Sequence, residues 1–382
     1  MRETDQILSL WAECEQAGES AVLATVVRTR GSSYRLPGAR LLITAQGRRA
    51  GSISGGCLED ELIKKAFWLT EGSRRTIRRY DTHPDDDGSP AYGLGCNGII
   101  DILLERVTPG DAKVLTLLNS VRKTRQPAVI AHVLQPQNLA GRRIYVRKDG
   151  QSADEIDDDL ATQLEAAAIT ALDELASCHV SFPHDGASVE AFVEVLPPPL
   201  RLLVFGAGDD AIPVTELARY LGWSVFVSDG RAHYARPERF PEANAVRTAR
   251  PAESEAQADA HIDQWTAAVL MSHSYSQDLE ALRVLAGASL CYLGILGPRK
   301  RTAQLLIDAG LDVSGLAASL HSPMGLDIGA DGPQQVALSV ITEIQASLNG
   351  RLGGSLKERP GSIHSRAEDD APVFTVHSIV CA

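Results

Sequence analysis

A single cysteine stands inside a glycine- and serine-rich segment, residues 51–60 (GSISGGCLED), which leads into a helical pattern over residues 59–69. Glycine lets the backbone approach a ligand closely, and the amides that open a helix bind anions. The thiol of Cys57 is therefore predicted to face whatever Gly55, Gly56 and the helix start hold. A small buried apolar residue is the alternative role for an isolated cysteine, and the glycine context favours ligand binding.

A second cysteine has similar surroundings. Residues 92–98 read YGLGCNG, so glycines also frame Cys96, directly before a strand pattern over residues 99–105. Two such loops within the first hundred residues indicate a shared purpose, and thiolates bind soft metals. Cys96 is equally compatible with packing in a core, so both interpretations stay open.

Arginines lie in the polar segment of residues 28–38 (RTRGSSYRLPG). The guanidinium groups of Arg30 and Arg35 are able to clasp a phosphate. A solvated hairpin uses the same residue types, so ligand binding by Arg35 is a hypothesis beside that simpler one.

Another candidate site begins near residue 200. An apolar strand pattern over residues 200–205 runs into GAGDDA (residues 206–211), a helix over 212–221, and a strand over 224–227 that leads to Asp229. This order is typical of dinucleotide-binding Rossmann units, in which Gly206 and Gly208 admit the pyrophosphate and Asp229 accepts a ribose hydroxyl. The carboxylates of residues 209 and 210 put negative charge where phosphate would lie, so a fold without a nucleotide is the alternative.

A histidine follows a later strand of the same pattern, residues 267–271. Loops at the carboxyl ends of strands hold the ligands of doubly wound sheets. His273 is therefore a candidate proton carrier, and a hydrogen-bonding role within its loop is the alternative.

The apolar periodicity places these segments in two domains of an α/β protein. Residues 1–199 read as an α+β domain, with a helix over 7–17, strands over 21–27, 39–44, 74–81 and 99–105, and a long helix over 157–176. Three consecutive prolines, residues 197–199, mark the boundary. Residues 200–348 alternate strand and helix, which predicts a Rossmann-like doubly wound parallel sheet. Residues 349–382 read as a C-terminal tail.

Composition and charge exclude several classes of protein. The 382 residues are 44% hydrophobic, enough for two cores, and the formal net charge of −12 argues against a nucleic-acid partner. The six cysteines contain no CxxC pair, which argues against structural zinc and a disulfide framework. The sequence has no signal-peptide pattern and no apolar run of about 18 residues. A cytoplasmic protein without a membrane segment is therefore expected.

Several strings of the sequence resemble the xanthine dehydrogenase accessory family, XdhC/CoxI. They are GSSYRLPGARLLI, GSISGGCLEDEL and GLGCNG in the first domain, and LLVFGAGDDA, VSDGR, LGILGPRKR and SPMGLDIGADGPQQVALSVITEI in the second. The resemblance covers most of residues 10–348 in the same order. It departs at Asn97, where the family usually has glycine, and at Asp209, where it usually has histidine.

This resemblance implies a molybdenum cofactor insertion and maturation factor. Such a protein binds the molybdenum cofactor, as molybdopterin or its dinucleotide form, supports its sulfuration with a cysteine desulfurase, and inserts it into an apo molybdenum hydroxylase. Members are typically homodimers and are not themselves known as dehydrogenases. By the resemblance, Cys57 is the molybdenum contact, Gly55, Gly56 and Glu59 shape its loop, and Cys96 is the second candidate.

Two other functions explain part of the pattern. An NAD(P)-dependent oxidoreductase, with Cys57 or His273 acting on substrate, accounts for Gly206, Gly208 and Asp229, but not for two glycine-framed cysteines in a separate domain. A nucleotide or redox sensor would use the same loops without turnover. The accessory role, which is not enzymatic, is the favoured interpretation.

Overall fold

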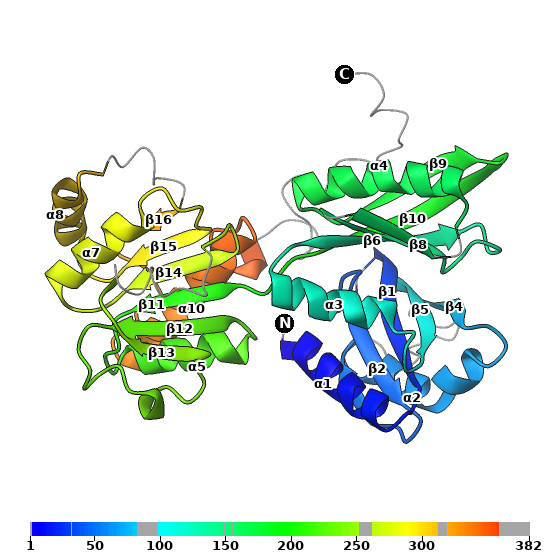
Figure 1. Ribbon diagram of the computed structural model, residues 1–382, viewed down its shortest axis with the longest axis horizontal. Coiled ribbons are helices and arrows are strands. Elements are labelled where there is room, and N and C mark those ends of the chain that lie inside the picture. Colours follow the sequence, from blue (N-terminus) through cyan, green and yellow to red (C-terminus); the bar gives the residue numbers. More distant parts are fainter. Residues whose placement is uncertain are drawn as a thin grey trace. The chain divides into compact units, whose positions relative to one another are not determined.

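The computed structural model describes residues 2–31, 33–81, 98–148, 150–154, 156–251, 262–311 and 319–358, with all their side chains except those of Arg2 and Cys57 (Figure 1). The described chain divides into two compact units. One is Glu3–Pro198, and the other begins at Pro199. The predicted α/β class, with an N-terminal mixed domain and a C-terminal Rossmann-like sheet, is confirmed.

The first half of the N-terminal unit is one helix, three strands, a second helix and two further strands. These are α1 (Arg2–Gln16), β1 (Ala21–Gly31), β2 (Arg40–Thr44), β3 (Arg49–Gly51), α2 (Cys57–Leu69), β4 (Arg75–Asp81) and β5 (Gly98–Val107). The strands form one antiparallel sheet in the order β3-β2-β1-β5-β4. The first seven residues of the central strand β1 are all buried, which explains its continuous apolar run.

The second half repeats this arrangement. Its elements are α3 (Lys113–Thr124), β6 (Ala128–Gln135), β7 (Arg143–Arg147), β8 (Gly150–Asp154), α4 (Asp158–Glu174), β9 (Cys178–His184) and β10 (Ala187–Leu196). The order of its sheet is β8-β7-β6-β10-β9, the order of the first sheet with each number raised by five. The N-terminal unit is therefore an internal duplication of one αβββαββ motif.

The pairing registers of the two sheets agree residue by residue. Thr25 pairs with Arg40 in the first sheet, and His132 pairs with Arg143 in the second. Further equivalent pairs are Leu23–Glu105 with Ile130–Glu194, Thr25–Leu103 with His132–Phe192, Arg28–Asp101 with Gln135–Glu190, Ile77–Leu103 with His179–Phe192, and Arg79–Asp101 with Ser181–Glu190. Both central strands also carry a β-bulge at the equivalent residue, Val27 or Leu134.

The two halves exchange buried ion pairs. Arg40 of the first half pairs with Glu194 of the second at 2.5 Å, and Arg143 of the second half pairs with Glu105 of the first. Arg40 is equivalent to Arg143 and Glu105 to Glu194, so one contact is made in both directions, as between two-fold related protomers. Each of the four side chains is at most 8% exposed.

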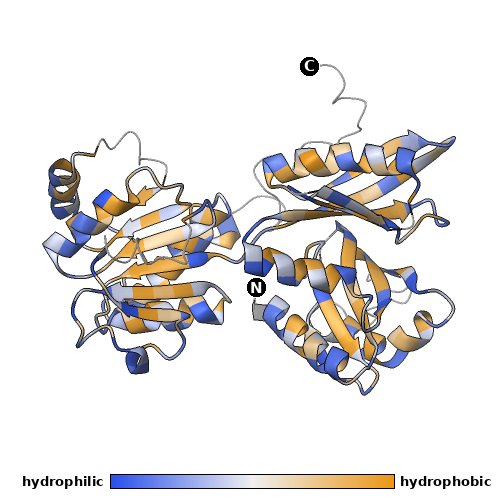
Figure 2. Ribbon diagram, viewed as in Figure 1, coloured by the Kyte–Doolittle hydropathy of each residue, from blue (hydrophilic) through white to orange (hydrophobic). Residues whose placement is uncertain are grey.

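Two helices cover the outer faces of these sheets, and the inner faces pack on each other. Leu58, Leu62 and Ala66 of α2 join the first sheet in one core, and α4 covers the second sheet in another (Figure 1). A third core joins α1 and α3 to residues of both sheets. The buried central strands β1 and β6 are accordingly hydrophobic along most of their length (Figure 2).

The C-terminal unit is a doubly wound parallel sheet. Its elements are β11 (Arg201–Phe205), α5 (Ala211–Tyr220), β12 (Ser224–Asp229), the short 3-10 helix η2 (Pro237–Arg239), β13 (Ala245–Thr248), β14 (Thr266–Leu270), α7 (Tyr275–Leu285), β15 (Tyr292–Ile295), α8 (Arg299–Ala309), β16 (Leu320–His321), α10 (Pro333–Leu348) and η3 (Leu356–Glu358). The strand order β13-β12-β11-β14-β15-β16 is the 3-2-1-4-5-6 order of Rossmann folds.

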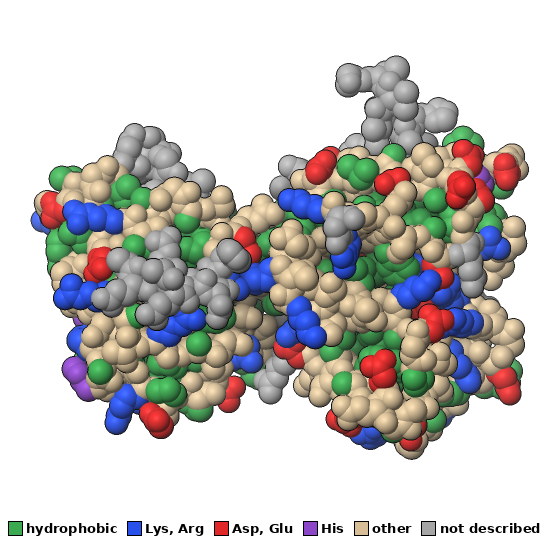
Figure 3. Space-filling model, viewed as in Figure 1, with side chains coloured by type: hydrophobic (Ala, Val, Ile, Leu, Met, Phe, Trp, Pro, Cys, Tyr) green, Lys and Arg blue, Asp and Glu red, His purple; other side chains and the backbone are tan. Residues whose placement is uncertain are grey.

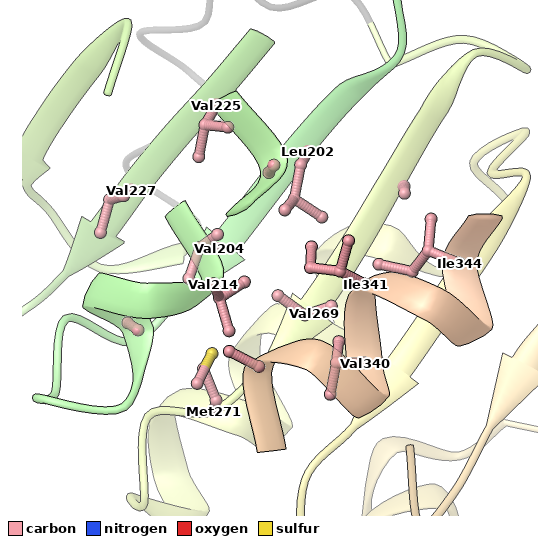
Figure 4. Packing of buried hydrophobic residues seen from close by; sticks show 14 of the residues in the cluster. Leu202, Val204, Val214, Val225, Val227, Val269, Met271, Val340, Ile341 and Ile344 are labelled. Atoms are coloured by element: carbon pink, nitrogen blue, oxygen red, sulfur yellow. The ribbon is translucent and has the colours of Figure 1, made fainter. Parts of the chain in front are cut away.

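Helices cover both faces of this sheet. Val214 of α5 and Val340, Ile341 and Ile344 of α10 pack on one face against strand residues such as Val204 (Figure 4). α7 and α8 pack on the other face. This arrangement leaves the carboxyl ends of the strands for loops, as the alternation of apolar patterns predicts.

Several elements differ from the sequence-based expectation. β1 runs to Gly31, through residues expected in a polar loop, because Arg28 to Gly31 continue the pairing with β5. The strands β3, β8, β9 and β13 were not predicted; they are short or polar, so their apolar period is weak. Within the described ranges, no helix is long and apolar enough to cross a bilayer.

Candidate functional site

The first candidate site is the connection from β3 to α2, residues 52–56. Gly51 precedes it at φ +87°, and a Cβ there would lie 2.3 Å from the carbonyl oxygen of Arg40. Gly56 caps α2 at φ +124°. Both positions need glycine, because other L-residues rarely adopt these angles. Of the two predicted glycines, Gly56 is therefore required by the backbone path, whereas no positive φ requires glycine at Gly55.

A carboxylate organises the interior of this loop. Glu59, which is 1% exposed, accepts hydrogen bonds from the backbone amides of Ile53 (3.0 Å), Ser54 (2.9 Å) and Gly56 (3.0 Å). It also accepts from the hydroxyls of Ser52 and Ser54. Burial opposes ionisation, but these hydrogen bonds outweigh it and lower the pKa of Glu59 to about 2.

The amides of this loop are consequently directed inward. The sequence predicted that loop amides would bind a ligand anion, and the amides of residues 53, 54 and 56 instead bind Glu59. What the loop can present outward is its glycine surface and the first turn of α2. A Cβ on Gly55 would meet the ring of Tyr34 at 3.9 Å, whereas one on Gly56 would have no described atom within 4 Å.

Arginine and tyrosine residues of the β1–β2 loop border the same site. Tyr34 is 65% exposed beside Gly55. Arg35 forms a bidentate ion pair with Glu3 of α1, with distances of 2.8 and 2.6 Å. The hydrogen bond to Arg35 lowers the pKa of Glu3. Arg35 therefore lies at the site, but its guanidinium already has an acidic partner.

The strand directions bring several loops to one end of the first sheet. Since neighbouring strands are antiparallel, the ends of β1, β3 and β4 and the starts of β2 and β5 lie at the same end. The glycine loop, the β1–β2 loop and both ends of the β4–β5 connection meet there. Cys96 itself lies outside the described residues, and the side chain of Cys57 is not described.

In the second half of the duplication the equivalent loops are shorter. The β8–α4 connection is residues 155–157, against 52–56 in the first half, and residues 185–186 alone join β9 to β10. Its helix starts with an ordinary cap, in which Asp157 accepts from the amide of Leu160 at 2.9 Å. The glycine-rich architecture belongs to the first half alone among the described connections.

The second candidate site lies at the carboxyl ends of β11, β12 and β14. Gly206 has φ +121°, and a Cβ there would lie 2.5 Å from the backbone of Met271. Ala211, completely buried, takes the third small position of the G-x-G-x-x-A pattern. Gly206, Gly208, Asp229 and His273, separated by up to 67 positions in sequence (273 minus 206), are brought to one edge of this sheet.

Asp229 is held by its own chain. The buried carboxylate accepts from the amide of Ala207 (2.9 Å) and from both the amide and the guanidinium of Arg231 (2.7 to 2.9 Å). Burial raises the pKa of Asp229, but the Arg231 and amide hydrogen bonds outweigh it, so the pKa is lowered. Arg231 also donates to the carbonyl of Ser272 at 2.9 Å. A ribose hydroxyl would have to share or displace these donors.

His273 and Asp210 bridge the point where the strand order reverses. Nε2 of His273 lies 2.7 Å from a carboxylate oxygen of Asp210, which joins the loop after β14 to the start of α5. Asp209 pairs with Arg239 at 2.6 Å. Each acidic residue near the helix start thus has a basic partner. Arg231 and Arg239 were not predicted as site residues, although the position of Arg231 two residues after Asp229 was an available signal.

Family models match both units of the chain. The model described as the XdhC and CoxI family matches residues 14–81, and the model of the XdhC Rossmann domain matches residues 202–344. A Bacillus subtilis (strain 168) protein, named as one of the probable subunits of a xanthine dehydrogenase, is 34% identical over 334 residues, covering 85% of this chain and 92% of that protein. The chain belongs to the XdhC and CoxI family. The resemblance seen in the sequence is confirmed.

Two further similar proteins match most of the chain. The Escherichia coli (strain K12) protein named "Molybdenum cofactor insertion chaperone PaoD" is 25% identical over 343 residues, 88% of this chain and 86% of that protein. A crystal structure described as a xanthine dehydrogenase from Bacillus halodurans has a TM-score of 0.74 and 25% identity, and covers 92% of this chain and 98% of its own. Both candidate sites fall within the matched family regions, and Cys96 falls between them.

Proposed function

We propose that this chain is an accessory protein that binds the molybdenum cofactor and inserts it into an apo molybdenum hydroxylase of the xanthine dehydrogenase type. The observation that carries the proposal is the glycine loop held from inside by Glu59, which fixes the start of α2 at Cys57. The names of the relatives, a molybdenum cofactor insertion chaperone and a component of xanthine dehydrogenase, support the same role.

The residues of this loop suit a sulfur-rich, anionic cargo. Cys57 supplies a thiol at the start of α2, where the helix dipole favours an anion. Soft thiolate ligands suit soft metal centres, so Cys57 is the proposed molybdenum contact. Gly55 and Gly56 offer backbone without side chains. Arg35 would release the carboxylate of Glu3 and bind a cofactor phosphate in its place. Cys96 is the second proposed contact.

The role proposed for Glu59 is to position this loop. With three backbone amides and two hydroxyls bound to it, the carboxylate keeps residues 52–56 in one conformation before any cargo arrives. A preformed loop binds more tightly, because less conformational entropy is lost on binding. Glu59 then acts through the loop, and not by direct contact with the cargo.

The Rossmann unit is proposed to hold a nucleotide, either NAD(P) or the nucleotide part of a dinucleotide cofactor. The required glycine at residue 206 and the buried Ala211 support this assignment. Asp229 would contact the ribose while sharing Arg231, and His273 would lie beside the ligand at the strand-order reversal. A nucleotide site in this unit would also be compatible with the two alternative functions, an NAD(P)-dependent oxidoreductase and a nucleotide sensor.

The proposed partners follow from the accessory role. Besides the apo hydroxylase, they are a cysteine desulfurase that sulfurates the bound cofactor and a second copy of this chain in a homodimer. The proposed location is the cytoplasm, where apo hydroxylases and reduced thiols are found. Basic and acidic side chains are interspersed on the face seen in Figure 3, an arrangement that suits a protein partner better than nucleic acid.

The proposal is tested by purifying the protein from a host that makes the cofactor and measuring bound molybdenum and pterin. The Cys57→Ala protein is expected to retain at least about tenfold less molybdenum and pterin than the wild type, because one charge-assisted contact is lost. Its circular dichroism spectrum should be unchanged. Cys178→Ala, at a half-buried cysteine of β9, is the matched control and should retain both. Undiminished cofactor in the Cys57→Ala protein would contradict the assignment.

The alternative function has a separate test. Steady oxidation of NADH or NADPH with any member of a panel of small carbonyl compounds would support the oxidoreductase, and its loss in a His273→Asn variant would place the chemistry at His273. Absence of turnover across the panel, together with cofactor retention by the wild type, favours the accessory role.

A further inference from the structure

A cavity of about 220 Å³ lies between the two sheets of the N-terminal unit, and none of the described residues that line it belongs to the glycine loop. Its apolar walls are Val27, Ile77 and Leu134. Its polar groups are Arg28, Arg79, Asp101, Gln135 and Gln137. The volume is below the roughly 300 Å³ at which pockets for drug-sized ligands begin, so a matching occupant is a single small ring system.

The internal duplication shows why this cavity is open. Both bulged residues, Val27 and Leu134, line it. On the other side of the duplication, His179 takes the position that Ile77 has here. The ring of His179 contacts the carbonyl oxygen of Val27 at 2.9 Å and stacks on Phe192 at 5.0 Å. Ile77 is shorter and has no polar atom, so the corresponding space remains unfilled.

The charged residues around the cavity also differ between the two halves of the duplication. In the filled half, Arg28 reaches across to Glu190 at 2.5 Å. The residue equivalent to Arg28 is Gln135, which carries no charge, and the residue equivalent to Glu190 is Asp101. Asp101 is instead held by Arg79, through two hydrogen bonds of 2.8 and 3.0 Å. The side chain of Arg79 is 50% exposed and that of Asp101 is 7% exposed.

These groups define the chemistry of an occupant. A carboxylate has about four lone-pair sites, so Asp101 can accept two adjacent N–H donors besides those of Arg79. The amides of Gln135 and Gln137 each offer donors and an acceptor, and guanidinium groups donate to ring carbonyls. The aliphatic side chains of Val27, Ile77 and Leu134 offer apolar contacts to the faces of a ring. The complementary edge has an amino group, a ring N–H and a carbonyl in a row.

We infer that this cavity is a binding subsite for a 2-aminopyrimidinone ring, the unit shared by pterins and guanine. This inference rests on the proposed function, in which the cargo carries a pterin and, in its dinucleotide form, can also carry a base. The residues that line the cavity are not those of the Cys57 loop, so the two sites can be tested with separate variants.

The test is a titration of the full-length protein with 6-hydroxymethylpterin, followed by its fluorescence, and with guanosine and adenosine by calorimetry. Gln135→Ala combined with Gln137→Ala removes two exposed amides, and Ile77→Phe fills the cavity. The glutamine double variant is expected to weaken binding roughly ten- to thirtyfold, the effect of two lost hydrogen bonds. Ile77→Phe is expected to weaken binding at least as much, because its ring occupies the space of the ligand. Gln126→Ala, at an exposed glutamine before the opposite end of β6, is the matched control and should bind like the wild type.

The outcomes separate the subsite from the proposed function. Binding of the pterin alone, or of guanosine alone, with the expected losses supports the subsite and identifies its source. Adenosine binding as tight as that of the other probes, equal affinity in wild type and variants, or no binding of any probe overturns it. Molybdenum retention that still depends on Cys57 would then leave the proposed function standing without this subsite.

Discussion

Glu194 on β10 accepts a hydrogen bond from the guanidinium of Arg40 on β2 at 2.5 Å, although the two residues belong to opposite halves of the N-terminal unit. The equivalent residues, Arg143 and Glu105, make the same contact in the reverse direction. Such reciprocal contacts arise when two copies of one motif pack about an approximate two-fold relation. The duplication therefore gives this unit a second, symmetric set of buried charges that no single segment predicts.

The first prediction concerns these pairs. Glu194→Gln is expected to lower the free energy of unfolding by about 3–5 kcal/mol, because it removes the carboxylate that Arg40 is paired with in the core. Glu105→Gln should cost less, because the carboxylate of Asp154 stays beside both Arg143 and Arg75. Glu13→Gln, which breaks the exposed pair with Arg48, should cost much less, because water screens this pair. Urea denaturation followed by circular dichroism measures all three. Equal losses at the buried and exposed pairs would contradict the arrangement.

The second prediction concerns the pH dependence that Glu59 contributes. Its folded pKa of about 2 lies below its ordinary value of 4.5, so the unfolded state takes up the proton first. The stabilisation is complete above about pH 4.5 and is lost as the pH falls toward 2. Glu59→Gln should be less stable than the wild type at pH 7, and the difference should shrink below pH 4.5. A constant difference from pH 7 to pH 3 would argue against this role.

The third prediction concerns His132, which is 1% exposed between the exchanged ion pairs. Burial, followed by the nearby guanidinium charges, lowers its pKa from 6.5. Since the unfolded chain binds the proton at higher pH than the folded chain, stability is lost as the pH falls below about 6.5. His132→Leu should flatten the dependence of the unfolding free energy on pH between 7 and 5.

A second histidine checks this mechanism independently. Burial also lowers the pKa of His179, so His179→Leu should remove a further part of the same slope. If both variants keep the wild-type slope, the histidines are not the groups that titrate.

The fourth prediction compares two glycines of the candidate loop. Gly51→Ala combines a positive φ with a Cβ placed 2.3 Å from a backbone oxygen, and is expected to cost on the order of 3 kcal/mol or more. Gly56→Ala meets no described atom within 4 Å and should cost only about 1–2 kcal/mol of backbone strain. Thermal unfolding ranks the two variants. A larger loss for Gly56→Ala would mean that the loop follows another path.

Sequence patterns alone predicted the family and the α/β class, and both are confirmed. The domain boundaries and the two candidate loops stay predictions. The strong signals were local: an uninterrupted apolar strand before GAGDDA, and glycines at positions where the backbone needs positive φ, such as Gly51 and Gly206. The duplication was missed, although residues 21–27 (AVLATVV) and 128–134 (AVIAHVL) nearly repeat. Elsewhere the two halves share pairing register more than residue identity, because a buried strand tolerates many apolar residues.

The tertiary structure decided which partner each polar group takes. From the sequence, Asp229 was available to a ribose and the loop amides were available to an anion, but Arg231 binds the first and Glu59 the second. Likewise, the cavity beside Ile77 is open because Ile77 is shorter than His179, which fills the equivalent space in the other half. Local propensity specifies elements and turns through short-range backbone energetics. Hydrogen-bond partners distant in sequence depend on the packing of whole sheets, so only the folded chain determines them.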